Sequence, residues 1–311
     1  MRILVTGGAG YIGSVLVPML LEREHHVTVL DNFMYGQASL LDCCHDARLT
    51  IMRGDVRDTA LLTGLAPKFD AVLPLACLVG APVCQQEPHT ATAVNRDAIQ
   101  ALVGAMSRQQ LLVFPSTNSG YGIGQSDVFC DEDTPLRPIS LYGRLKTELE
   151  SFLLDRGDCV TFRLATVFGV SPRMRLDLLV NDFVYRAVTD RFLVLFEAHF
   201  KRNFLHVRDA ARAFLHAIDH FDAMKGRPYN VGLSDANISK WELCEVIQRQ
   251  LPEFYFAEAA IGEDPDKRNY VVSNARIEAT GFRTSVGLNE GIAELIKGYQ
   301  VIRRNEYTNV R

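Results

Sequence analysis

The feature that most constrains this 311-residue chain is a glycine run close to its N-terminus. Residues 7–13 read GGAGYIG and follow a short apolar run at residues 3–5. Glycines at positions 7, 10 and 13 permit a tight turn, a close approach of the backbone to a pyrophosphate, and close packing of the next helix on the strand. The free N–H groups and the positive dipole end of that helix then face the anion. The run predicts a strand, turn and helix that bind a dinucleotide, with an ordinary glycine turn as the alternative.

A carboxylate follows at the position where such a unit needs one. The apolar residues 27–30 read as a second strand that ends in Asp31, eighteen residues after Gly13. A carboxylate at this point can hold both ribose hydroxyls of an adenosine, and it repels a 2′-phosphate. Asn32 and Phe33 follow, and neither offers a cation to a 2′-phosphate. We therefore expect NAD as the cofactor, with a solvated aspartate as the alternative.

Further apolar runs set the fold class. Residues 49–52, 71–73, 111–114 and 160–164 alternate with helical patterns, and the longest of these helices is expected from about Ser140 to Leu154. Short apolar strands alternating with helices predict an α/β fold, a doubly wound parallel sheet of the Rossmann type with both faces covered. Ligands of such sheets bind at the carboxyl ends of the strands.

Beyond Leu164 the regular alternation stops. We expect a helix over residues 178–188, a returning strand at 202–207, a capping box at 239–242 that opens a helix to Leu251, and a final helix over 288–303. We predict an NAD-binding domain of residues 1–165 with returning segments at about 204–232. Residues 166–203 and 233–311 would form a smaller α/β substrate-binding lobe, with the substrate in the cleft between the two.

Composition narrows the class of partner. The net charge is −4 with scattered Lys and Arg, which gives no electrostatic footprint for nucleic acid or a membrane surface. The longest apolar stretch, residues 71–83, contains two prolines and is too short to span a bilayer. The glycine run leaves no room for a signal peptide, and seven cysteines without a CxxC pair suit reduced thiols in the cytoplasm. We expect a small-molecule substrate and no metal site.

Tyr142 and Lys146 place a phenol and an ammonium on one helix face. A free tyrosine is ionised only about one part in a thousand at pH 7, and lowering its pKa by about three units takes roughly 4 kcal/mol. A lysine, helped by the positive nicotinamide of a cofactor, could supply that energy. The phenolate would then take a proton from a substrate alcohol. A chance pair on an amphipathic helix is the alternative.

A loop rich in hydroxyl groups follows the fifth predicted strand. Residues 116–122 read STNSGYG and fall at the sheet edge where the cofactor should lie. Thr117 can donate a hydrogen bond to the same alcohol or accept one from it. A hydroxyl that merely stabilises the turn is the alternative.

With these residues in place, the chain resembles the extended short-chain dehydrogenase/reductase family of nucleotide-sugar epimerases, dehydratases and dehydrogenases over essentially its whole length. The resemblance rests on the glycine run, Asp31, the pair Asp55 and Val56, the hydroxyl loop and the Tyr-x-x-x-Lys pentad. It implies NAD as cofactor, a nucleotide sugar as substrate, and a homodimer formed through the helices near residues 95–107 and 142–154.

The resemblance also implies roles for individual residues. The catalytic residues are Thr117, Tyr142 and Lys146. The expected cofactor contacts are Gly7, Gly10, Tyr11, Ile12, Gly13, Asp31, Asn32, Asp55, Val56, Leu75, Ala76, Tyr142 and Lys146. The expected substrate contacts are Asn118, Ser119, Asn181, Arg202 and Arg268, the last two at the diphosphate. Asn95 and His206 are expected to be structural, and Pro74 replaces a histidine of many relatives.

Residues of the hydroxyl loop also differ between members of the family that catalyse different reactions. A 4,6-dehydratase would carry an Asp-Glu pair where this chain has Asn118 and Ser119, and an epimerase acting at C3 and C5 would carry a cysteine in this loop. The residues present support oxidation at one carbinol.

Three segments, residues 116–124, 162–183 and 262–268, look closest to bacterial enzymes that oxidise the C4 hydroxyl of GDP-heptoses, such as GDP-D-glycero-α-D-manno-heptose, for capsule or surface polysaccharide. A nucleotide-sugar 4-epimerase is the first alternative, because it needs the same Tyr142 chemistry. A non-catalytic dinucleotide-sensing protein is the second, and its usual mark is the loss of the tyrosine or the lysine.

Overall fold

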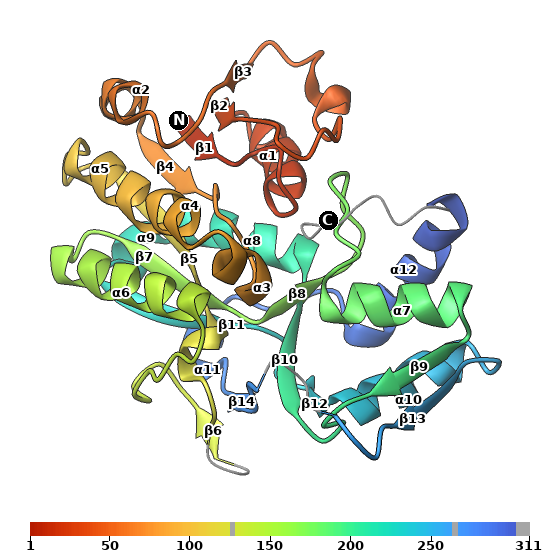
Figure 1. Cartoon of the computed structure of the whole chain (residues 1–311). Coiled ribbons are helices and arrows are strands. Elements are labelled where there is room, and N and C mark those ends of the chain that lie inside the picture. The colour runs from red at the N-terminus through yellow and green to blue at the C-terminus, as the bar shows by residue number, and fades with distance from the viewer. Residues whose placement is uncertain (125–127, 263–266, 303–311) are drawn as a thin grey trace.

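A computed structural model describes residues 1–124, 128–262 and 267–302. Its centre is a parallel sheet of seven strands in the order β11-β7-β5-β4-β1-β2-β3 (Figure 1). The strands are β1 (Arg2–Thr6), β2 (His26–Asp31), β3 (Leu49–Arg53), β4 (Ala71–Pro74), β5 (Leu111–Thr117), β7 (Val160–Leu164) and β11 (Arg227–Val231). The predicted Rossmann-type α/β fold is therefore confirmed.

Both faces of this sheet are buried, as alternate residues of β1 show. Ile3 and Val5 join one hydrophobic core, and Leu4 between them joins the other. The first core includes helices α1 (Gly13–Glu22) and α8 (Val207–Asp219). The second includes α2 (Thr59–Leu65), α5 (Ala98–Gly104) and α6 (Leu141–Arg156). Shorter helical segments, α3 (Ala81–Gln86), α4 (Pro88–Thr92), a π-helical turn (Ala93–Asp97) and α9 (Phe221–Met224), complete the covering layers.

The second half of the chain builds a separate core from small sheets and three helices. One sheet joins β8 (Thr166–Phe168), β10 (Lys201–His206) and β12 (Asn237–Ser239), and another joins β9 (Phe192–Leu195) and β13 (Tyr255–Glu258). The helices are α7 (Leu179–Thr189), α10 (Lys240–Gln250) and α12 (Leu288–Val301). The strands β6 (Phe129–Cys130) and β14 (Val271–Val272) pair, and α11 (Ala275–Ala279) follows them.

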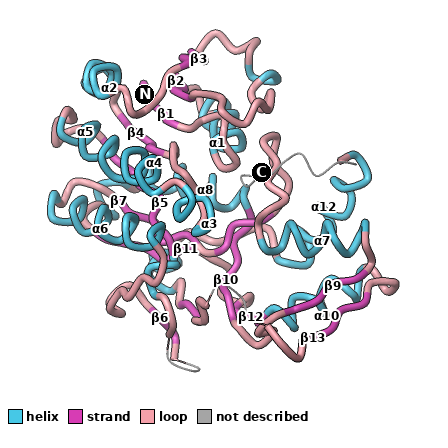
Figure 2. The backbone as a smooth tube through the Cα atoms, viewed as in Figure 1, coloured by secondary structure: helices cyan, strands magenta, loops and turns pink. Residues whose placement is uncertain are grey.

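The path of the chain between the cores is not linear, as the tube view shows (Figure 2). After β8 has entered the third core, residues 205–231 return to the first core through Leu205, Phe214 and Val231. Leu233 then starts the return to the third core. The limits of the two predicted lobes remain a prediction, but each core draws on more than one stretch of chain.

Most predicted elements are present with limits shifted by a few residues. The predicted long helix is α6, which begins after Ser140, whose Oγ accepts a hydrogen bond from Gly143 N (3.1 Å). The predicted capping box is formed by Ser239 and Glu242. The final helix ends at Val301, and residues 303–311 of the predicted lobe lie outside the described residues. The sequence did not predict β11 as a strand. No helix in the described part is long and apolar enough to cross a membrane.

Candidate active site

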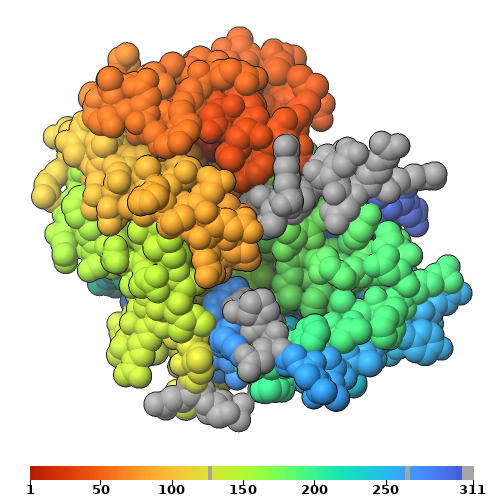
Figure 3. All heavy atoms as spheres, viewed as in Figure 1, coloured from red at the N-terminus to blue at the C-terminus, as the bar shows by residue number. Residues whose placement is uncertain are grey.

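A large cavity lies at the carboxyl ends of the central strands, between the first two cores and the third. Its volume is about 1170 Å³, which is sufficient for a large extended ligand. In the space-filling view the N-terminal half, red to yellow, meets the green segment around residues 165–200 along the middle of the molecule (Figure 3). The expected site residues on its wall are Gly7, Gly10, Tyr11, Ile12, Gly13, Asp31, Asn32, Asp55, Val56, Leu75, Ala76, Thr117, Ser119, Tyr142, Lys146, Arg202 and Arg268.

The glycine run forms a tight backbone turn in which a side chain at Gly7 or Gly13 would collide with the protein backbone. Gly7 has a φ of +71°, and a Cβ there would lie 2.5 Å from the backbone N of Ala76. A Cβ on Gly13 would lie 2.6 Å from the backbone O of Gly7. Helix α1 starts directly behind the run, and its N-cap residue Ile12 makes no side-chain capping bond. This geometry fits a pyrophosphate held against backbone N–H groups.

Asp31 is fixed at the end of β2. One carboxylate oxygen accepts a hydrogen bond from Ala9 N (3.0 Å), and the other accepts one from Phe33 N (2.8 Å). Burial raises the pKa of this carboxyl above its usual value, although the two backbone donors oppose the shift. Nearby, the pKa of Asp55 is lowered because Arg57 donates to both its oxygens. Asp31 is thus oriented toward the part of the cavity expected to hold an adenosine ribose.

We predict that the protein binds NAD at least about tenfold more tightly than NADP, a difference of roughly 1.4 kcal/mol, because Asp31 would face the 2′-phosphate with a like charge. Asp31→Asn should bring the two affinities closer together, because NAD loses a hydrogen-bond acceptor for its ribose and NADP no longer faces a like charge. Isothermal titration with both dinucleotides measures it, and Asp42→Asn, an exposed carboxylate outside the cavity wall, is the control. Tighter binding of NADP to the unaltered protein would remove this role from Asp31.

Thr117, Tyr142 and Lys146 all line the cavity, from the neighbouring elements β5 and α6. Thr117 ends β5, and the other two project from the first turns of α6. Lys146 is only 3% exposed, its Nζ donates to the backbone O of Pro115 (2.8 Å), and it lies 4.5 Å from the ring centre of Phe114. The ammonium is therefore held rigidly at the end of β5.

The pKa of Tyr142 differs from the sequence-based expectation. Burial raises it above the ordinary tyrosine value, and Cys77 and Cys84 add to the rise. Arg175 and Arg268 oppose the rise only in part. The protein's own groups therefore favour the neutral phenol, and the expected lowering must come from charge added to the cavity.

Two of the expected substrate residues do not reach the cavity wall. Asn181 is fully buried: its Oδ1 accepts from Gly169 N (3.0 Å), and its Nδ2 donates to Arg175 O (2.8 Å) and to the Tyr11 hydroxyl (3.2 Å). Asn118 is 1% exposed and lies between Thr117 and Ser119, which both reach the wall. Asn181 is thus bonded to the protein itself, whereas the buried amide atoms of Asn118 have no hydrogen-bond partner among the described residues, and substrate contact by either residue stays a prediction.

The structure also brings unassigned residues into the cavity. Arg173 and Arg175 line it from the loop after β8, and Arg173 lies 3.9 Å from the ring centre of Tyr35. Burial, together with Arg175, lowers the pKa of Arg173 to about 10. Cys77 reaches the wall from the segment after β4 and not from the hydroxyl loop, where an epimerase acting at C3 and C5 would carry its cysteine. Nothing in the sequence around Arg173 and Arg175 indicates that this loop faces the cavity.

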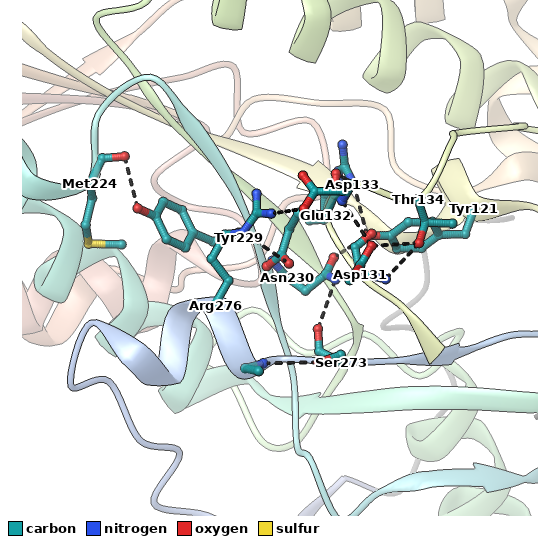
Figure 4. Close-up of polar contacts among 12 residues, drawn as sticks. Tyr121, Asp131, Glu132, Asp133, Thr134, Met224, Tyr229, Asn230, Ser273 and Arg276 are labelled. Carbon is teal, nitrogen blue, oxygen red and sulfur yellow. Dashed lines mark hydrogen bonds and ion pairs between the residues drawn. The ribbon is translucent and has the colours of Figure 1, made fainter. Parts of the chain in front are cut away.

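A polar cluster, of which Tyr121, Glu132 and Asn230 are buried, anchors the hydroxyl loop (Figure 4). Oη of Tyr121 lies 2.7 Å from Oδ1 of Asn230 and 2.8 Å from the backbone O of Asp131. Glu132 accepts a hydrogen bond from Asn230 N (2.7 Å), and Arg276 pairs with Asp133 (2.7 Å). The loop that carries Thr117 is thus tied to β11 and α11, which fixes its position.

The seven cysteines are all free thiols, and the described residues contain no group of three His, Cys, Asp or Glu side chains that could hold a metal ion. Asn95 is buried and pairs with the backbone of Leu78 in both directions (2.8 and 2.9 Å). His206 is also fully buried, and burial lowers its pKa to about 4. Both positions agree with the structural roles expected for these residues.

The fold and the cavity fit a class of protein, the dinucleotide-dependent enzymes of the Rossmann type, and we expect the tyrosine, the lysine and the threonine on the cavity wall to act on an alcohol. Residues 3–232 match the NAD dependent epimerase/dehydratase family. The chain belongs to this family, and the family description confirms the expectation of NAD.

Named relatives cover almost the whole chain. The UDP-glucose 4-epimerase of Corynebacterium glutamicum is 30% identical over 302 residues, which cover 89% of this chain and 88% of the relative. A dTDP-glucose 4,6-dehydratase of an Actinoplanes species is 29% identical and covers 97% and 99%. The structure of the Thermus thermophilus UDP-glucose 4-epimerase in complex with NAD superposes with a TM-score of 0.82 at 27% identity, covering 96% of this chain and 99% of that one.

Proposed function

We propose that the protein is an NAD-dependent 4-dehydrogenase of a nucleotide-activated sugar, with a GDP-heptose as substrate. One observation carries the proposal. The cavity wall presents Thr117 and Tyr142 together, whereas positions 118 and 119, which hold an acid and a base in a dehydratase, carry a buried asparagine and a serine. Alcohol oxidation uses the first pair, and water elimination would need the second.

The chemistry assigned to the residues follows from their positions. Glycines 7, 10 and 13 with the start of α1 would hold the pyrophosphate of NAD, and Asp31 would hold its adenosine ribose. When bound, NAD supplies the hydride acceptor, so the sugar alcohol becomes a ketone and NADH is formed. Tyr142 takes the hydroxyl proton of C4, and Thr117 donates a hydrogen bond to the same oxygen. Lys146, from the next turn of α6, would stabilise the phenolate.

Two further arginines of the cavity wall suit a diphosphate. Arg202 is 3% exposed, Arg268 is partly buried, and both line the wall. A guanidinium fork matches phosphate oxygens in pairs. The choice of a GDP-heptose, and of capsule or surface-polysaccharide synthesis in the cytoplasm as its setting, rests on the resemblance of residues 116–124, 162–183 and 262–268, of which 263–266 lie outside the described residues.

A nucleotide-sugar 4-epimerase is the second candidate. The similarity to the UDP-glucose 4-epimerase of Corynebacterium glutamicum favours it. An epimerase uses the same proton transfer at Tyr142 but returns the hydride to the opposite face of the ketone.

We also propose a homodimer through the segments 95–107 and 142–154, which include parts of α5 and α6 on one face of the sheet, and sedimentation equilibrium would test it.

We predict that a GDP-heptose incubated with NAD gives a 4-keto sugar and one NADH per turnover. C6 should remain oxygenated, because Asn118 and Ser119 cannot drive elimination. Early in the reaction, no deuterium from heavy water should enter C3 or C5. Absorbance at the NADH band and product NMR, run over a panel of GDP-, UDP-, CDP- and dTDP-sugars, measure these outcomes. Clean conversion between two C4 epimers at constant cofactor would instead establish the epimerase.

A further inference from the structure

Three side chains on the cavity wall form a continuous hydrogen-bonded chain. Nη1 of Arg268 donates to Oγ of Ser119. The hydroxyl of Thr117 donates to the same Oγ (3.0 Å), and Ser119 N donates to Oγ1 of Thr117 (3.1 Å). All three residues lie on the cavity wall. A cation of the second half of the chain is therefore linked, through one serine, to the hydroxyl that is to meet the reacting oxygen.

The backbone holds both ends of this chain in register. Gly124 N donates to Asn269 O (2.8 Å), and Asn269 N donates to Gly122 O (3.4 Å), so the residue after Arg268 pairs with the continuation of the hydroxyl loop. Asn269 Oδ1 also accepts from Lys201 N at the start of β10 (2.9 Å). With the polar cluster of Figure 4 around Tyr121, the distance between Arg268 and Thr117 is fixed by main-chain contacts.

We propose that Ser119 and Arg268 are positioning residues that act through Thr117 on the oxygen of the reacting alcohol. The inference rests on the proposed function. In the present arrangement Oγ of Ser119 accepts two hydrogen bonds, from Arg268 and from Thr117. Turning the Ser119 hydroxyl toward Thr117 reverses one bond and frees the Thr117 proton for the substrate oxygen. The order of donation is then Arg268 to Ser119, Ser119 to Thr117, and Thr117 to the sugar.

This order suits the charge that develops during oxidation. The alcohol oxygen becomes more negative as its proton leaves for Tyr142, and preorganised donors stabilise such charge most where water is excluded. Hydrogen bonds in a chain polarise one another, and a chain that starts at a guanidinium is charge-assisted. Arg268 thereby supports the chemical step from a distance, in addition to any contact with a diphosphate.

A cycle of variants separates this role from simple binding. If Arg268 only holds a diphosphate, its loss raises KM and does not depend on Ser119. If the chain operates, Ser119→Ala and Arg268→Gln will each lower kcat about tenfold to a hundredfold, and the double variant will lose little more than the worse single variant. Single-turnover rates with C4-deuterated substrate show whether the chemical step itself has slowed.

Arg202 provides the matched control. It lines the same cavity from β10, and its Nη1 donates to the backbone O of Lys201 (2.9 Å). Arg202→Gln should raise KM. In the double variant with Ser119→Ala, the fold-change in kcat/KM should equal the product of the two single-variant fold-changes. Ser119→Thr, which keeps a hydroxyl, should recover most of kcat. NAD affinity and the thermal midpoint, measured for every variant, report whether the fold is kept.

A second readout does not depend on turnover. With the 4-keto product bound beside NAD, the carbonyl stretch in isotope-edited infrared spectra should lie at a lower frequency in the unaltered protein than in Ser119→Ala, because the chain polarises the carbonyl. An unchanged kcat and carbonyl frequency in Ser119→Ala would overturn the inference while the dehydrogenase proposal stands. If the unaltered protein forms neither NADH nor a C4 epimer from any sugar of the panel, the proposed function itself fails, and the inference with it.

Discussion

Replacing Tyr142 by phenylalanine will slow oxidation about 10²- to 10⁴-fold, the usual contribution of a general base, while NAD binding stays nearly intact. The phenol projects from α6 into the cavity, where it is placed to take the alcohol proton, and removal of its oxygen leaves the cavity shape almost unchanged. Lys146→Met should damage both rate and cofactor binding, because the ammonium is buried at the end of β5 and is also expected to reach the nicotinamide ribose. Stopped-flow NADH formation and dinucleotide titration separate the two effects.

The pH dependence of the rate gives a second test of Tyr142. Burial raises the pKa of this phenol, so the phenolate is scarcer at neutral pH than in free tyrosine unless bound NAD adds its positive charge. The rate of oxidation should therefore rise with pH until the phenol is deprotonated in the complex, and Tyr142→Phe should lose this rise. Tyr255→Phe, at an exposed position on β13, is the control. Near-normal turnover in Tyr142→Phe would show that the pentad is only structural.

Glu150→Ala will lower the free energy of unfolding by about 3–5 kcal/mol, because it leaves the charge of Arg163 buried without its carboxylate. Nη2 of Arg163 lies 2.7 Å from Oε1 of Glu150, and the two side chains are 6% and 2% exposed. Arg163 also donates to the Tyr121 hydroxyl (3.0 Å) and to Glu132 O (3.1 Å), so it joins α6 to the polar cluster that anchors the hydroxyl loop.

Urea unfolding measures this loss of stability. Glu148→Ala on the same helix is the matched control, since Glu148 is exposed and such substitutions change stability by about 0.5 kcal/mol or less. A loss below about 1 kcal/mol in Glu150→Ala would mean that water or another group relieves the Arg163 charge. If the variant also oxidises its substrate more slowly at temperatures where it is still folded, the ion pair of Glu150 and Arg163 helps to hold Thr117 in place.

Local patterns predicted the parts of the site that local structure controls. The glycine run, Asp31 and the Tyr142–Lys146 pair each lie within one strand, turn or helix, so their spacing already sets which way they point. The central strands were predicted for the same reason, because each is a short apolar run with both faces buried. The edge strand β11 was not, since its sequence RPYNV contains Arg, Pro and Asn and no apolar run, and its pairing with β7 depends on contacts distant in the sequence.

Side-chain direction and contacts between distant segments were not predictable. Asn118 follows a strand, and which of residues 117–119 face the cavity depends on how the loop is anchored by Tyr121. Asn181 is an expected substrate contact, and no sequence pattern shows that its side chain is bonded to the backbone of the loop after β8. The rise in the pKa of Tyr142 depends on burial by residues from several segments, and no spacing in the sequence reports burial.

The repeated passage of the chain between cores has a consequence for how new specificities can arise. Residues 205–231 return to the first core, and the segment after residue 232 contributes to the third core and, through Ile277 and Phe282, to the first as well. A single recombination crossover within residues 166–232 would therefore divide at least one core between two parents. Exchange of the expected substrate-binding part, residues 166–203 and 233–311, between relatives therefore requires three joins. Point substitutions on the cavity wall avoid this difficulty, so we expect substrate preference in this protein to change more readily by single residues than by exchange of whole segments.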